Sequence, residues 1–211
     1  MRPHLLACLI AAAVAVAVAA AAGRPAGVLL LPILAALVVP FAASSPKGHL
    51  GFASALGLTF GGTAWGVLAG LGAAKALTLF HLLAAFSLLL AAACSPARAR
   101  RASPGVVLLS GAIPGFLLLG TVFYADPLVH AAEGSPRLSR AVVTTSISAN
   151  PILVLSQHVG DEDLLHTAFY GRSTIGDRFF VYLPAWQPSL AFGAVALALW
   201  ALSRLLARPE V

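Results

Sequence analysis

The sequence from residue 76 to residue 103 reads ALTLFHLLAAFSLLLAAAC followed by SPARARRAS, and this stretch decides the fold class. Its long apolar part contains one ionisable side chain, His81. In a helix rising 1.5 Å per residue, about 20 residues cross the hydrocarbon core of a bilayer, which is roughly 30 Å thick. Three arginines follow at once, and such a cluster is difficult to translocate. The stretch therefore predicts a transmembrane helix whose C-terminal end faces the cytoplasm.

The composition of the whole chain also indicates a membrane protein. Of its 211 residues, 60% are hydrophobic and 9% are charged, whereas a soluble domain carries about 25% charged residues. So few charges cannot cover a water-facing surface, which excludes the soluble, disordered and disulfide-rich secreted classes. The formal net charge of +6 would suggest nucleic acid in a soluble protein. In a membrane protein the location of charge matters more than its sum, so no nucleic-acid partner is expected.

Further apolar runs of similar length lie on both sides of residues 76–94. We predict an all-α integral membrane protein, a six-transmembrane-helix bundle in the lipid bilayer, with spans at residues 5–22, 27–44, 51–71, 76–94, 105–124 and 189–207. Five spans thus occupy residues 1–124, and the sixth lies in residues 188–211 with a short tail. The first span, preceded by Arg2, also fits a cleavable signal peptide, and that alternative stays open.

The lysines and arginines of the short loops set the predicted orientation. With a cytoplasmic N-terminus, the basic residues inside are Arg2, Lys47, Arg98, Arg100, Arg101, Arg204 and Arg208. Only Arg24 and Lys75 then lie in short outer loops. We expect both termini in the cytoplasm. The Ala-, Gly- and Arg-rich composition and the short loops favour a multi-pass protein of a bacterial inner membrane.

Small residues in the predicted spans indicate close helix packing. Gly62, Gly66 and Gly70 recur every fourth residue of the third span and leave a groove for another helix. The helix in that groove belongs either to this chain or to another subunit. Cys8 and Cys94 lie in different spans and are interpreted as packing residues that form no disulfide.

Residues 125–187 form a predicted extracytoplasmic segment between the fifth and sixth spans, largely helical, with six of the chain's seven acids. Asp126-Pro127 and Ser135-Pro136 each predict a helix start, because a capping side chain precedes a proline in the first turn. Asn150-Pro151 ends the second of these helices. The apolar residues 152–157 are expected to lie in the interface, to dip back into the membrane or to form a short strand. A third helix is expected over residues 161–171.

One cluster in this segment could bind a divalent metal. His158, Asp161, Asp163 and His166 combine imidazoles with carboxylates, which ligate Zn²⁺ and similar cations. A capped helix with an acidic first turn explains the same residues. No nucleotide-binding motif occurs, and no haem is expected because no other span offers a histidine at the depth of His81.

A second stretch of the segment is a candidate partner-binding surface. Tyr170, Arg172 and Asp177 lie among Gly residues and hydroxyl side chains. Arg172 either pairs with Asp177 across a surface turn or meets an anionic partner.

These features predict a non-catalytic subunit of a larger membrane complex of a transport, export or respiratory type. Its extracytoplasmic segment is expected to bind a partner or a lipid-linked cargo, and other membrane subunits or a second copy are expected beside it. One alternative is an integral membrane enzyme that uses the cluster from His158 to His166 at the outer surface. Another alternative is a small permease or half-transporter built on proline-kinked spans.

Overall fold

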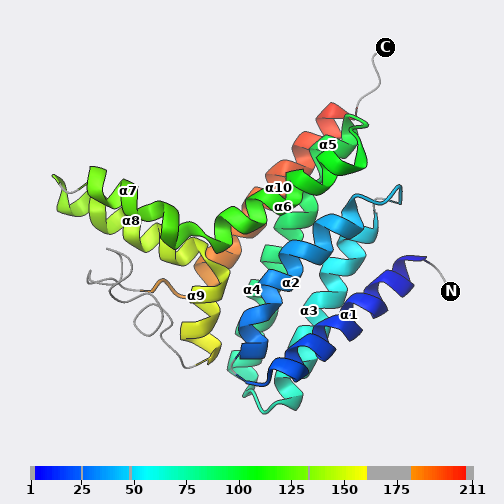
Figure 1. The fold of residues 1–211 in the computed structure, drawn as a ribbon, viewed down its shortest axis with the longest axis horizontal. Helices are drawn as coiled ribbons and strands as arrows, with labels where there is room; N and C mark the ends of the chain where they lie inside the picture. Colours follow the sequence, from blue (N-terminus) through cyan, green and yellow to red (C-terminus); the bar gives the residue numbers. More distant parts are fainter. Residues whose placement is uncertain (1–2, 25, 48, 133, 161–181, 208–211) are drawn as a thin grey trace.

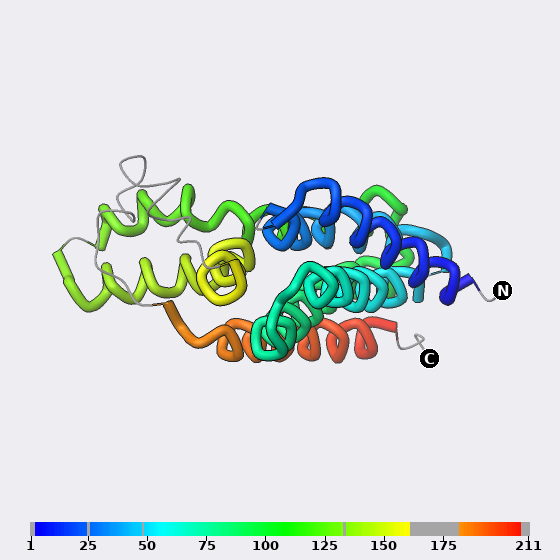
Figure 2. The backbone as a smooth tube through the Cα atoms, turned by 90° about the horizontal axis from the view of Figure 1, so that it is seen from below, coloured from blue at the N-terminus to red at the C-terminus, as the bar shows by residue number. Residues whose placement is uncertain are grey.

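The computed structural model describes residues 3–24, 26–47, 49–132, 134–160 and 182–207, and every regular element in these ranges is helical (Figure 1). The expected all-α fold is confirmed for this part of the chain. The longer helices lie side by side in a bundle, and a helical hairpin leaves it sideways (Figure 2).

Four of the described helical segments are long and apolar enough to cross a membrane. They are α1 (Pro3–Ala22), α2 (Ala26–Ala43), α4 (Ala73–Ala93) with the short α5 (Ser95–Ala99), and α10 (Trp186–Leu206). Two bent pairs of helices raise the number to six if each pair counts as one span. The chain is therefore a helical protein with four to six candidate membrane spans.

Helix α3 (His49–Leu68) lies among α1, α2 and α4, although it is not one of the four candidates. Its glycines allow this central position. A methyl group on Gly57 or Gly61 would overlap the backbone of α1 at Cys8 or Ala12. These two glycines thus allow a close contact between α3 and α1, which is the packing mode of small residues in membrane helices.

The glycines expected to form the packing stripe have different surroundings. A methyl group on Gly62 would lie 2.8 Å from Leu31, and one on Gly66 would lie 2.7 Å from Leu71, so both glycines face leucines of this chain. Gly70 follows the end of α3 and has a φ of +87°, a conformation that favours glycine. Contacts within the chain therefore account for Gly62 and Gly66.

The predicted fifth span, residues 105–124, is not one continuous helix. Helix α6 (Pro104–Leu119) ends early, and α7 (Thr121–Ala131) continues at a bend of 63°. The hydroxyl of Thr121 donates to the carbonyl of Leu118 at 3.2 Å and to that of Ser146 at 2.8 Å, so a side chain satisfies part of the helix end. The predicted helix start at Asp126-Pro127 is wrong, because both residues lie inside α7.

Helix α8 (Pro136–Ala149) returns along α7, and together they form the α7–α8 hairpin, which projects from the side of the bundle (Figures 1 and 2). The helix start predicted at Ser135-Pro136 is confirmed, and the Ser135 hydroxyl accepts a hydrogen bond from the Leu138 amide at 3.4 Å. The hairpin has a separate small core of Val122, Ala125, Val129, Val143, Ile147 and Leu153.

After the hairpin the chain bends by 77° and enters the bundle through α9 (Pro151–Leu155) and the π-helical turn η1 (Ser156–Gly160). Both segments contact α2 and α4, and Val154, Leu155 and Val159 belong to the main core. The short strand considered for residues 152–157 is wrong, because these residues are helical and pack within the bundle. The interfacial and re-entrant alternatives stay predictions.

Helix α6, the α7–α8 hairpin and the segment α9–η1 together form what we call the interrupted passage. Asn150 joins the end of α6 to the start of α9. Its side-chain amide donates to the carbonyl of Leu119 at the end of α6, at 2.7 Å. Its side-chain oxygen accepts from the amides of Ile152 at 3.0 Å and Leu153 at 3.3 Å, at the start of α9. One side chain therefore satisfies polar groups at the ends of both half-helices.

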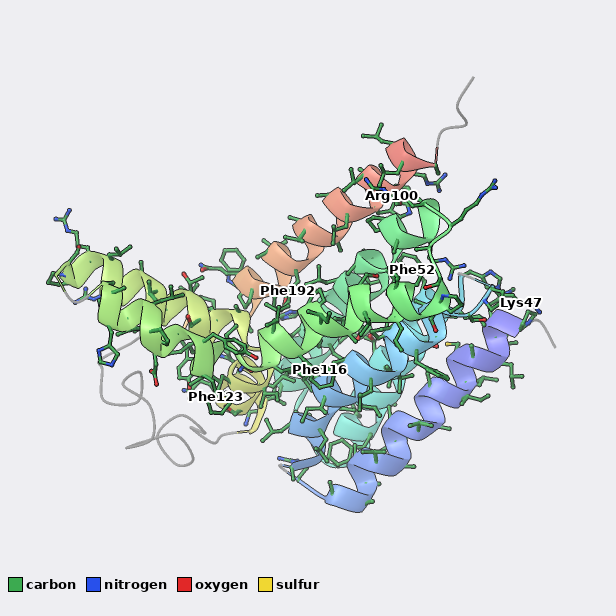
Figure 3. The ribbon with its side chains drawn as sticks, turned by 45° about the horizontal axis from the view of Figure 1, so that its top comes forward. Lys47, Phe52, Arg100, Phe116, Phe123 and Phe192 are labelled. Carbon is green, nitrogen blue, oxygen red and sulfur yellow. The ribbon has the colours of Figure 1, made fainter. Side chains whose placement is uncertain are left out.

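The basic side chains of several segments gather at one end of the bundle, which we call the basic end and which includes Lys47, Arg98, Arg100 and Arg204 (Figure 3). Arg98 donates to the carbonyls of Ala43, Ser45 and Pro46 and so caps the C-terminus of α2. At the opposite end, Arg24 donates to the carbonyl of Ala69 at 2.6 Å, just after α3.

The substitution Asn150→Ala tests the junction between α6 and α9. It leaves the Leu119 carbonyl and two amides without partners, so we expect the free energy of unfolding to fall by about 2–4 kcal/mol. The measurement is reversible unfolding of the purified protein in detergent, followed by circular dichroism. The matched control is Ser148→Ala, because the buried Ser148 hydroxyl has no hydrogen-bond partner among the described residues. Equal losses in the two variants would show that Asn150 has no special role.

Candidate functional site

The predicted metal and partner residues lie mostly outside the described residues. Among the four candidate metal ligands the structure describes His158, on η1, whereas Asp161, Asp163 and His166 are not described. Tyr170, Arg172 and Asp177 also lie outside the described residues. Both sites therefore stay predictions.

His158 lies where the interrupted passage ends and the chain later returns to α10. Its Nε2 atom lies 3.1 Å from the carbonyl oxygen of Leu183, and its ring meets Tyr182 edge-on with 6.5 Å between ring centroids. Because a carbonyl oxygen only accepts, Nε2 carries the proton in this bond. In the neutral ring, Nδ1 is then the nitrogen with a free lone pair.

His81, on α4, bonds to α10 in the way expected for a lone histidine between helices. Its Nδ1 atom lies 2.8 Å from the hydroxyl oxygen of Ser189. That hydroxyl donates its single proton to the carbonyl of Ala185 at 2.9 Å, so it accepts from His81. The proton of a neutral His81 is therefore on Nδ1, and Nε2 keeps the lone pair.

The two histidines form one polar site between α4, η1 and the start of α10. The two segments that carry these rings, α4 and η1, pack against each other. Each ring is oriented by a hydrogen bond through one nitrogen, which is how proteins commonly orient metal-binding histidines. Within the described part of the chain, no group of three His, Cys, Asp or Glu side chains could hold a metal. The histidine pair alone thus supplies at most two ligands.

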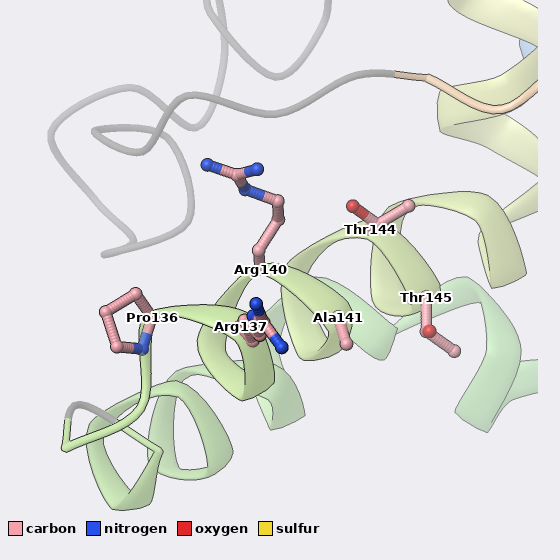
Figure 4. Close-up of a pocket in the computed structure, with 6 residues that line it drawn as sticks. All are labelled: Pro136, Arg137, Arg140, Ala141, Thr144 and Thr145. Atoms are coloured by element: carbon pink, nitrogen blue, oxygen red, sulfur yellow. The ribbon is translucent and has the colours of Figure 1, made fainter.

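A second polar site lies on the α7–α8 hairpin. A surface hollow on α8 is lined by Pro136, Arg137, Arg140, Ala141, Thr144 and Thr145, and we call it the α8 hollow (Figure 4). Figure 4 shows Arg140 and Thr144 pointing the same way from successive turns. Both arginines are exposed, and neither has a hydrogen bond or an acidic partner among the described residues. The α8 hollow can therefore offer several donors to an anion.

No protein-family model, curated protein or solved structure matches this chain.

Sequence reasoning missed both of these arrangements. The partnership of His81 with Ser189 joins residues from two distant helices, and no local pattern indicates it. The α8 hollow does leave a signal, since arginines at positions 137 and 140 precede threonines at positions 144 and 145 on one predicted helix. Side chains three or four positions apart share a helix face, so this spacing predicts a polar stripe.

The substitution Ser189→Ala tests the tautomer of His81. In the unaltered protein we expect the Nδ1-protonated form of His81, because the Ser189 oxygen accepts only from a protonated nitrogen. Without that oxygen, the ring is expected to populate both tautomers. Side-chain nitrogen chemical shifts of ¹⁵N-histidine-labelled protein measure this change.

The control is Ser203→Ala, which removes a hydroxyl near the other end of α10 that donates to the carbonyl of Trp200. It should leave the His81 signals unchanged. A His81 ring protonated on Nε2 in the unaltered protein would contradict the geometry.

Proposed function

We propose that the chain is a non-catalytic, multi-pass subunit of a larger membrane complex, of a transport, export or respiratory type. In this proposal the bundle anchors the protein in a bacterial inner membrane. The α7–α8 hairpin is the surface through which it binds a partner subunit or a lipid-linked cargo.

The observation that supports this role most directly is an exposed apolar face of α7, which we call its outer face. Tyr124 and Leu128 are 54% and 58% exposed, whereas Val122, Ala125 and Val129 of the same helix lie in the hairpin core. The hairpin packs mainly on itself around a core separate from that of the bundle. An exposed apolar face on a hairpin that is not part of the bundle core is typical of a binding surface.

The distribution of charge supports an orientation for this role. Lys47, Arg98 and Arg204 come from three separate segments and meet at the basic end. By the positive-inside tendency we propose that this end faces the cytoplasm, with both termini on that side. Arg24, at the opposite end, is engaged in capping α3 and so has a structural role there.

The interruption between α6 and α9 favours a second candidate, a small permease. Broken helices often form transporter binding sites because their ends carry free polar backbone groups. Here, however, Thr121 and Asn150 already bond to the carbonyls of Leu118 and Leu119 and to the first amides of α9. A substrate would have to displace these bonds, so the binding-subunit proposal accounts for the geometry better.

Photocrosslinking in native membranes tests the proposed binding surface. A benzophenone amino acid replaces Leu128 on α7, and in a matched variant it replaces Leu9 on α1, which is 51% exposed. We expect discrete adducts of one protein or lipid-linked molecule from position 128, identified by mass spectrometry, because that face meets a specific ligand.

Position 9 should give only diffuse adducts with bulk lipid, since α1 faces the bilayer. If the two positions give the same products, the hairpin is not the binding surface.

A further inference from the structure

The arginines of the α8 hollow have no structural task in the described part of the chain. Arg24 and Arg98 donate to backbone carbonyls, and Arg204 lies 4.7 Å from the centre of the Trp200 ring. Arg137 and Arg140 make no comparable contact with any described residue. They lie in the first turns of α8, where the helix dipole opposes a positive charge, so helix stability does not require them.

The threonines beside these arginines differ in their hydrogen bonds from the threonines of the bundle. Thr59, Thr63 and Thr78, on bundle helices, each donate to the carbonyl four residues earlier, at 2.8, 2.8 and 3.0 Å. Thr144 and Thr145 have no such bond among the described residues, although they also lie on a helix. The α8 hollow therefore combines two guanidinium groups with two available hydroxyls.

The exposed apolar side chains near the α8 hollow indicate which kind of anion binds there. On the same hairpin, Leu138 is 55% exposed, and the outer face of α7 presents Tyr124 and Leu128. A negative group suits the α8 hollow, and long apolar chains suit these exposed side chains. Guanidinium groups match phosphate oxygens well, because they can donate two parallel hydrogen bonds.

We propose that the α8 hollow binds the phosphate headgroup of an anionic membrane lipid, while the outer face of α7 lies against acyl chains. The inference rests on the proposed function in one respect, that the hairpin is a binding surface at the membrane. It adds the chemical class of the ligand. Amphipathic helices that combine arginines with apolar side chains bind anionic lipid surfaces by this division of contacts.

The test is a lipid titration of the purified full chain in a neutral detergent. A fluorophore on Leu138→Cys, with Cys8 and Cys94 replaced by alanine, reports binding next to the α8 hollow without lining it. The probes are phosphatidylglycerol and the zwitterionic phosphatidylcholine. We expect phosphatidylglycerol to bind at least about 10-fold more tightly, because it carries a net negative charge.

The double variant Arg137→Gln/Arg140→Gln removes both guanidinium groups from an exposed surface, so the fold should persist. Each basic residue near an anionic lipid surface contributes about five-fold to binding, so the pair should weaken phosphatidylglycerol binding by about 25-fold. The matched control, Lys47→Gln/Arg100→Gln, removes the same charge at the basic end and should change binding at the fluorophore by less than about two-fold.

Three results would overturn the proposal. The first is equal binding of the two lipids, and the second is unchanged binding by Arg137→Gln/Arg140→Gln. The third is displacement of the lipid by millimolar inorganic phosphate, which would make the α8 hollow a site for free phosphate.

A further variant, Asp161→Asn/Glu162→Gln/Asp163→Asn, tests whether the acidic residues 161–163 of this chain compete with the lipid for the α8 hollow. The lipid proposal predicts less than about a two-fold change in binding. A rise of about 10-fold would show that these acids occupy the hollow, against the proposal. Because photocrosslinking at Leu128 does not depend on lipid class, the proposed function can survive when the lipid inference fails.

Discussion

The side-chain amide of Asn150 is the contact on which the course of the chain between residues 104 and 160 depends. It is buried, with 4% of its surface exposed, and it bonds to the last carbonyl of α6 and to the first amides of α9. In an apolar interior, each of these backbone groups would otherwise lack a partner, at a cost of about 1–3 kcal/mol. The amide therefore allows a helix to stop inside the bundle, release a hairpin of two helices and resume.

The bundle, the histidine pair and the hairpin differ in the side chains that hold them together. The bundle is held by small residues in close contact, such as Gly57 and Gly61 against α1, and by Arg98, which closes the basic end over α2. The histidine pair lies toward the other end, where α4, η1 and α10 meet. The α7–α8 hairpin has its own core and an uncovered apolar face.

Much of the bundle could be predicted from sequence because its determinants are local. Residues 5–22, 27–44, 76–94 and 189–207 are apolar runs whose helices differ from the prediction by a few residues at each end. The fifth span could not be predicted in the same way, because residues 105–124 are as apolar as the others. Its end at Leu119 is set by Thr121 and Asn150 bonding across 25 and 31 residues of chain. The helix start predicted at Pro127 is wrong because α7 continues through this proline. The packing of Val122, Ala125 and Val129 against α8 stabilises the helix there.

The interrupted passage is tested most directly by labelling single cysteines with a membrane-impermeant maleimide, before and after the membrane that contains the protein is opened. Cys8 and Cys94 are replaced, and cysteine is placed at Leu138, Leu155 or Arg100. We expect rapid labelling at position 138, no labelling at position 155, which is fully buried in the bundle, and, in the proposed orientation, labelling at position 100 only after that membrane is opened. Labelling at position 155 as rapid as at position 138 would contradict the central claim, because residues 151–160 would then lie outside the bundle.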